Sequence, residues 1–186
     1  HDVSRLDTTD LIPFREYINA GLSGVMVGHL NVPALDYSGT PASLSKKITT
    51  DLLKSKMGFE GLIFTDALEM KGAKVPGVNN CVQAFIAGAD MLLASSSPMN
   101  DIIAFEKAVN SGKISKQEVE RRCRKILAYK YALNLQNEKP VNTTGLLAKI
   151  NSPKAEDVNR RLSEALMTVI KKKKSLLPIS NLENKS

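Results

Sequence analysis

The fold of this chain is decided by one stretch, Gly58-Phe59-Glu60-Gly61-Leu62-Ile63-Phe64-Thr65-Asp66-Ala67-Leu68-Glu69-Met70-Lys71-Gly72. Its apolar run ends abruptly at a carboxylate. A short run of Leu, Ile and Phe is typical of a strand buried on both faces of a parallel sheet. An Asp directly after such a strand costs free energy unless it faces a pocket. In barrels of alternating strands and helices, the carboxyl end of the strand carries the active site. We therefore predict that Asp66 is a catalytic residue.

The composition is that of an ordinary globular protein. The chain has 186 residues, of which 42% are hydrophobic and 24% are charged. No run of about 18 apolar residues occurs, so we predict no membrane span. Cys81 and Cys123 lie far apart and form no CxxC or Cys/His cluster, so we expect no metal site.

The net charge of +7 raises the question of nucleic acid. The basic residues collect at 121–125 and 171–174 and form no single stripe with interleaved aromatic residues. The chain has no Trp and therefore little capacity to stack on bases. We expect solvated helix faces and helix ends, and no nucleic-acid partner.

Short apolar runs alternate with amphipathic stretches, which is typical of βα units around a parallel sheet. Ser43 or Ser45 is expected to cap one helix, Ser115 with Glu118 forms a capping box before another, and Ser152 precedes the last. Glu118 with Arg122, and Glu120 with Arg124, are spaced to pair across one helical turn. The expected elements are helices at 11–20, about 45–57, 80–87 and 101–110, helices beginning after Ser115 and after Ser152, and strands at 25–29, 61–65 and 89–94.

Three such units cannot close a barrel, which needs eight strands. We predict an α/β fold: at 1–135, about the last three βα units of a partial (β/α)8 TIM-type barrel, followed by helices and a linker. Residues 136–186 are expected to be a linker and a helix leading toward a second α/β domain that is not included. The start at His1 suggests a processed or truncated piece. A small free-standing three-layer α/β domain is the structural alternative.

Five blocks, in order, resemble glycoside hydrolase family 3 and specifically its β-N-acetylglucosaminidase branch. They look like the sixth barrel strand with its loop, the helix before the seventh strand, the nucleophile segment, the eighth strand and the connection to a second domain. In this chain they are Ser23-Gly24-Val25-Met26-Val27-Gly28-His29 with 32–36, then 41–61, Thr65-Asp66-Ala67-Leu68-Glu69-Met70, Ala87-Gly88-Ala89-Asp90-Met91-Leu92-Leu93, and 159–178.

This resemblance implies a retaining β-glycosidase that works by double displacement. Asp66 would attack the anomeric carbon and form a covalent glycosyl–enzyme intermediate, while an acid protonates the leaving oxygen and later activates water. His29, at the end of its strand, and Met70, at the end of the nucleophile segment, are the predicted substrate-binding residues. The chemistry uses carboxylate and proton transfer, so we expect no cofactor and no metal.

The acid/base group departs from the family pattern. In this branch it is an Asp–His pair on a Gly-rich loop, and the chain contains no matching segment. His1-Asp2 has both residue types, but its spacing and context differ, and we expect Glu69 to point away from Asp66. The acid/base residue is therefore expected upstream of His1.

The predicted function is that of a fragment of a retaining β-N-acetylglucosaminidase, acting on terminal β-linked N-acetylglucosamine in cell-wall-type or chitin-like glycans. The small Ala67 after the nucleophile favours this branch over β-glucosidases and β-xylosidases of the same family, which remain the alternative. The second alternative is a folded fragment without activity of its own. The partner is thus a carbohydrate, and a periplasmic or secreted location is favoured over a cytoplasmic one. The oligomeric state is not indicated.

Overall fold

A computed structural model describes residues 2–93 and 96–168 of the chain. The chain divides into two compact units, His1–Asn137 and Glu138–Ser186. The terminal His1 lies outside the described residues.

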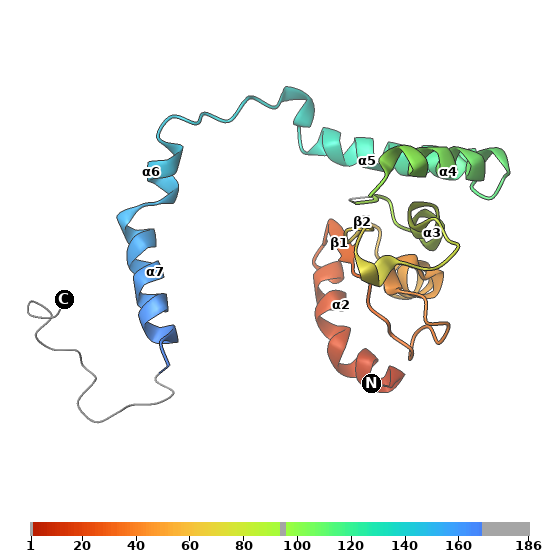
Figure 1. Cartoon of the computed structure of the whole chain (residues 1–186), viewed down its shortest axis with the longest axis horizontal. Helices are drawn as coiled ribbons and strands as arrows, with labels where there is room; N and C mark the ends of the chain where they lie inside the picture. The colour runs from red at the N-terminus through yellow and green to blue at the C-terminus, as the bar shows by residue number, and fades with distance from the viewer. Residues whose placement is uncertain (1, 94–95, 169–186) are drawn as a thin grey trace, which may run out of the picture. The chain divides into compact units, whose positions relative to one another are not determined.

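The first unit is built around two parallel strands, β1 (Gly24–Val27) and β2 (Leu62–Thr65) (Figure 1). Their register pairs Gly24 with Leu62 and Val27 with Thr65. Ile63 and Thr65 are fully buried, whereas Phe64 is half-buried and its neighbour Met26 is 62% exposed. The prediction of burial on both faces is therefore right for one face, and the other is only partly covered.

The predicted third strand at 89–94 is reduced to a single parallel bridge between Phe64 and Met91. The Thr65 N–H donates to the Met91 carbonyl at 3.0 Å. Two residues on, the Leu93 N–H donates to the Thr65 hydroxyl at 2.9 Å, so a side chain takes the place of a backbone carbonyl. The ladder therefore ends after one bridge. Parallel strands joined through helices confirm the α/β class.

The helices of this unit follow the predicted order, with shifted ends. The predicted helix at 80–87 is confirmed: α3 begins after the Asn79 side chain accepts from Val82 N, and it ends at Gly88, whose φ of 125° suits glycine. α4 begins at Pro98, earlier than predicted, because proline is favoured in the first helical turn. The bounds are α1 Val3–Arg5, η1 Leu6–Asp10, α2 Ile12–Asn19, η2 Ala42–Leu44, η3 Lys47–Lys56, η4 Lys71–Ala73, α3 Asn80–Ala87, α4 Pro98–Asn110, α5 Lys116–Ala132 and η5 Leu135–Asn137.

Two of these segments wind more widely than an α-helix. In η1 the Leu11 N–H donates to the Leu6 carbonyl at 2.8 Å, and at the end of η3 the Met57 N–H donates to the Leu52 carbonyl at 2.9 Å. These i+5 bonds are π-helical. The predicted helix at 45–57 therefore exists with a wider turn, and Leu53 on its apolar face is buried.

The core lies between the strands and the helices. α3 packs against η2, η3 and α4 (Figure 1). One apolar cluster includes Leu44, Leu53, Phe59, Ile63 and Leu68, and a second, of Val82, Phe85, Ala108 and Ile114, lies between α3 and α4. Burial of these side chains stabilises the strands that carry the candidate site.

The basic face of α5 corrects one prediction. The capping residue Ser115 is confirmed, since its hydroxyl accepts from Glu118 N at 3.1 Å, and the predicted Glu118–Arg122 pair forms at 2.7 Å. Arg122, however, is only 6% exposed and donates to the carbonyls of Phe85 and Ala89 at 2.7 and 2.5 Å. The interpretation of the basic residues as solvated is wrong here, because the buried Arg122 donates to backbone carbonyls at and just after the end of α3.

The second unit contains α6 (Leu146–Ile150), which was not predicted, and α7 (Pro153–Leu166). The Ser152 hydroxyl accepts from Ala155 N at 3.3 Å, which confirms the predicted cap. The lysine run at 171–174 and the end of the block at 159–178 lie outside the described residues. Within the described ranges, no helix combines the length and hydropathy needed to cross a membrane.

Candidate active site

Asp66 is the first residue beyond β2, at the carboxyl end of the strand. Its N–H donates to the Val27 carbonyl of β1 at 3.1 Å, while Thr65 just before it bonds to Met91 on the other side. The half-buried Asp66 therefore lies between two neighbouring parallel segments. This is where the ligands of α/β enzymes bind.

The two oxygens of the Asp66 carboxylate differ. Oδ1 accepts the N–H of Ala67 at 2.7 Å, which orients the group. Oδ2 accepts no hydrogen bond from any residue that the structure describes. A carboxylate held by one oxygen and open at the other can act as an oxygen nucleophile or as a base.

His29 follows β1 and is brought against the segment after Asp66. Its Nε2 lies 2.9 Å from the Ala67 carbonyl oxygen, and its Nδ1 lies 2.6 Å from the Ser43 hydroxyl. The structure thus brings His29 against the peptide that follows Asp66. Direct contact between His29 and a substrate stays a prediction.

Ser43 is the residue that the sequence reasoning missed. It was predicted as one of two possible caps, but it is 1% exposed and its hydroxyl faces His29. Ser45 does the capping instead, with its hydroxyl 3.4 Å from Ile48 N and 2.5 Å from Asp36 Oδ2. That hydroxyl, together with the other donors around it, holds the pKa of Asp36 far below its usual range. No local pattern distinguishes the two serines.

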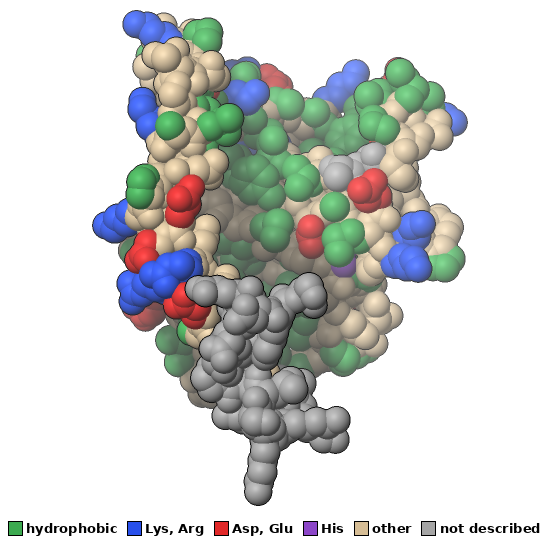
Figure 2. All heavy atoms as spheres, turned by 60° about the vertical axis from the view of Figure 1, so that its left-hand side comes forward, with side chains coloured by type: hydrophobic (Ala, Val, Ile, Leu, Met, Phe, Trp, Pro, Cys, Tyr) green, Lys and Arg blue, Asp and Glu red, His purple; other side chains and the backbone are tan. Residues whose placement is uncertain are grey.

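Met70 and Glu69 lie on the loop that follows. Met70 is 48% exposed, and its N–H donates to the Ala67 carbonyl at 3.0 Å. Glu69 is exposed, and we assign it no catalytic role. Figure 2 shows hydrophobic side chains gathered on one face of the molecule, with acidic side chains among them. Exposed apolar residues near these strand ends are Leu30, Met70 and Leu93.

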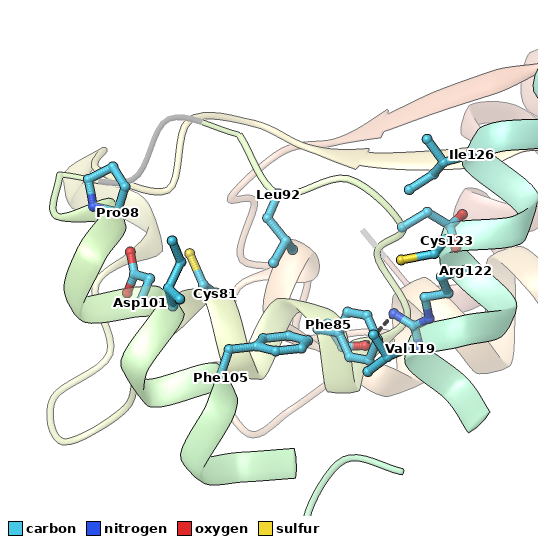
Figure 3. A pocket seen from close by; sticks show the side chains of 12 residues that line it. Cys81, Phe85, Leu92, Pro98, Asp101, Phe105, Val119, Arg122, Cys123 and Ile126 are labelled. Atoms are coloured by element: carbon cyan, nitrogen blue, oxygen red, sulfur yellow. Dashed lines mark hydrogen bonds between the residues drawn. The ribbon is translucent and has the colours of Figure 1, made fainter. Parts of the chain in front are cut away.

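A cavity of about 370 Å³ lies elsewhere, among α3, α4 and α5 (Figure 3). It is lined mainly by apolar side chains. Phe85 and Phe105 meet edge to face with ring centroids 4.8 Å apart. The Arg122 guanidinium stacks on Phe85, with Cζ 3.8 Å from the ring centroid. Asp66, His29 and Met70 do not line it.

Across the described residues, no three His, Cys, Asp or Glu side chains gather as metal ligands.

Residues 1–129 match the family described as "Glycosyl hydrolase family 3 N terminal domain". The chain belongs to glycosyl hydrolase family 3. This confirms the family and, with the relatives below, the β-N-acetylglucosaminidase branch to which its sequence blocks are similar.

Three known proteins illustrate the similarity. A "Beta-hexosaminidase" of Chromobacterium violaceum is 40% identical over 52% of this chain and 27% of its own length. A "Beta-N-acetylglucosaminidase/beta-glucosidase" of Cellulomonas fimi is 25% identical over 96% of this chain and 34% of its own. The structure of a family 3 beta-N-acetylglucosaminidase from Paenibacillus sp. str. FPU-7 is 34% identical, with a TM-score of 0.75 over 86% of this chain and 31% of that one. The chain thus spans about a quarter to a third of the length of these relatives.

Proposed function

We propose that this chain is the nucleophile-bearing part of a retaining β-N-acetylglucosaminidase. Its first unit would be about the last three βα units of a (β/α)8 barrel. The observation that carries the proposal is Asp66 Oδ2, a carboxylate oxygen that accepts no hydrogen bond from the described residues and lies at the carboxyl end of a parallel strand in a family 3 domain. The similarity to proteins named beta-hexosaminidase supports N-acetylglucosamine as the sugar.

In this proposal Asp66 forms the covalent intermediate. Oδ2 attacks the anomeric carbon, the bond from that carbon to the leaving oxygen breaks, and the leaving oxygen takes a proton. Water then attacks the same carbon, gives up a proton and releases Asp66 as a carboxylate. The bond from Ala67 N to Oδ1 keeps the carboxylate from rotating, so little orientational freedom is lost on attack. The proposal assigns the proton transfers to no residue of this chain.

Met70 and His29 are proposed to form part of the wall of the sugar pocket. Met70 presents an exposed, flexible apolar side chain beside the Asp66 loop, and such a side chain suits the C–H face of a sugar. Because both His29 nitrogens lie against protein atoms, its contribution to the wall would come from the ring edge or face.

The second candidate function is β-glucoside hydrolysis by the same nucleophile. It is favoured by the relative from Cellulomonas fimi, whose name gives both activities and which aligns over 96% of this chain. Both candidates use Asp66 in the same way and differ only in the group accepted at the sugar's second carbon.

The test is turnover of nitrophenyl N-acetyl-β-glucosaminide and nitrophenyl β-glucoside, with Asp66→Asn as the control. Their leaving groups are activated, so they depend less on an acid than on the nucleophile. A fluorinated donor sugar that forms the intermediate faster than it is hydrolysed should label the peptide containing Asp66. Cleavage unaffected by Asp66→Asn, or a label on another carboxylate, would refute the assignment. A folded chain that turns over neither substrate and takes no label would support the inert-fragment alternative.

We further propose that residues 136–186 belong to a connection between the barrel and a second domain, and that the parent enzyme is exported and acts on cell-wall-type glycans. The support is the similarity of the 159–178 block to the connection in two-domain members of the family. Fractionation of cells that express the parent protein would test the location.

A further inference from the structure

His29 joins three segments that are distant in the sequence: the end of β1, η2 and the turn after β2. Its Nδ1 lies 2.6 Å from the hydroxyl of Ser43 in η2, and its Nε2 lies 2.9 Å from the Ala67 carbonyl. Gly72 lies close by, because a Cβ placed there would be 3.2 Å from His29 Cβ. The ring is therefore held between the strand end and the loop that carries Asp66.

The chemistry of these partners determines which nitrogen carries the proton. A carbonyl oxygen only accepts, so the bond to Ala67 requires a hydrogen on Nε2. The neutral ring then has a lone pair on Nδ1, and the Ser43 hydroxyl can donate to it. Because Ser43 is 1% exposed, water competes little for that lone pair, and the buried serine favours the Nε2–H tautomer.

The peptide units flanking Ala67 are held on both sides. The Ala67 N–H donates to Asp66 Oδ1 at 2.7 Å, and the Ala67 carbonyl accepts from Met70 N at 3.0 Å as well as from His29. Rotation of these peptide planes would carry the donor of the Asp66 carboxylate with it. Whatever fixes the Ala67 carbonyl therefore also influences where Asp66 Oδ2 points.

We propose that His29 is a positioning residue: held as the Nε2–H tautomer by Ser43, it fixes the Ala67 peptide and thereby aims the Asp66 carboxylate at the anomeric carbon. The proposal rests on the assignment of Asp66 as nucleophile in the proposed function. It adds His29 and Ser43 to the residues on which catalysis depends, and Ser43 touches no reacting atom.

The first test needs no turnover. The chain has two histidines, so ¹⁵N-histidine labelling gives two ring systems, and His29→Gln identifies that of His29. At pH 8 we expect the Nε2–H tautomer. We also expect the Ala67 amide to exchange about tenfold faster in His29→Leu than in wild type, and to be unchanged in Leu30→Ala, a neighbouring exposed side chain. An Nδ1–H tautomer, or an Ala67 amide indifferent to His29→Leu, would overturn the proposal, whether or not the chain hydrolyses a sugar.

The second test separates positioning from sugar binding. With nitrophenyl N-acetyl-β-glucosaminide we expect His29→Leu to lower kcat about 10- to 100-fold with little change in KM. His29→Gln, whose amide can donate to the Ala67 carbonyl, should recover part of kcat. Ser43→Ala alone should lower kcat about threefold to tenfold. Added to His29→Leu, it should lower kcat almost no further. A raised KM at constant kcat, or no recovery with Gln in a variant that unfolds like wild type, would contradict the positioning role.

Discussion

The two ends of the strand pair carry two aspartates with opposite surroundings. At the amino end of β2, the Asp90 side chain is completely buried, and its Oδ2 accepts from Ile63 N at 2.9 Å and from Lys125 Nζ at 3.0 Å. At the carboxyl end, the half-buried Asp66 accepts one N–H and leaves Oδ2 open among the described residues. One carboxylate holds the structure together, and the other is available for chemistry.

An aspartate thus has different partners, and a different proposed role, at each end of the strand pair. Lys125 also donates to the Gly61 carbonyl at 2.6 Å, so α5 is joined to the start of β2 through both groups. In barrels the carboxyl end is the catalytic one and the amino end supports stability, and the roles proposed for the two aspartates correspond to that division. Variants at each end should therefore affect different measurements.

The largest expected effect is that of Asp66→Asn on turnover. Removing the proposed nucleophile should lower kcat on the order of a thousandfold or more. The free energy of unfolding should change by less than about 1 kcal/mol, because the amide oxygen can still accept from Ala67 N. Steady-state kinetics and urea unfolding measure the two. Loss of stability without loss of turnover would reverse the roles of the two aspartates.

Asp90→Ala should be the most destabilising of these substitutions. It leaves Lys125, 20% exposed, without its carboxylate, and leaves the buried Ile63 N–H without its acceptor. We expect a loss of about 2–4 kcal/mol in the free energy of unfolding by urea. The matched control is Asp51→Ala, which removes an exposed pair with Lys46 and should cost less than about 1 kcal/mol. Equal losses in the two variants would contradict the structural role of Asp90.

Lys54 should make the amino end sensitive to alkaline pH. The pKa of Lys54 is lowered to about 8, chiefly by burial; Asp90 opposes this shift, and the nearby cations Arg122 and Lys125 add to it. Between pH 8 and the ordinary value of 10.5, the unfolded chain binds more protons, so this group makes stability rise with pH. Lys54→Met should raise stability at pH 7 on the order of 1 kcal/mol.

Urea unfolding of wild type and Lys54→Met at pH 7, 8, 9 and 10.5 measures this effect. The difference between the two proteins should shrink as the pH rises through that window. A difference that stays constant across it would show that Lys54 titrates normally.

The smallest effect is expected at the start of α5. Ser115→Ala removes the acceptor for Glu118 N and should cost about 1 kcal/mol of stability. Turnover should be unchanged, since α5 supports the amino end of the strands. Thermal unfolding and kinetics on the same preparation check both. A loss of turnover comparable to that of Asp66→Asn would show that the two ends are not separable.

Local patterns predicted what local chemistry determines. The sequence predicted the apolar run before Asp66, the helix at 80–87 and the Ser115 cap of α5, because each signal lies within a few residues of its effect. The third strand was predicted too long, because the end of its ladder depends on the Thr65 side chain of another strand. The wide turns of η3 had no signal that we recognised.

The sequence alone determined the parallel α/β character, the placement of Asp66 at a strand end and the resemblance to glycosidases, because hydrophobic period and motif spacing are properties of the chain itself. Only the tertiary structure decided that Ser43 faces His29, that His29 holds the Ala67 carbonyl and that Arg122 is buried. These partners lie 14 to 38 residues apart for His29, and 33 to 37 for the carbonyls that Arg122 binds. Contacts over such separations depend on how the elements pack, and a serine or arginine carries the same local signal whether it meets water or another side chain.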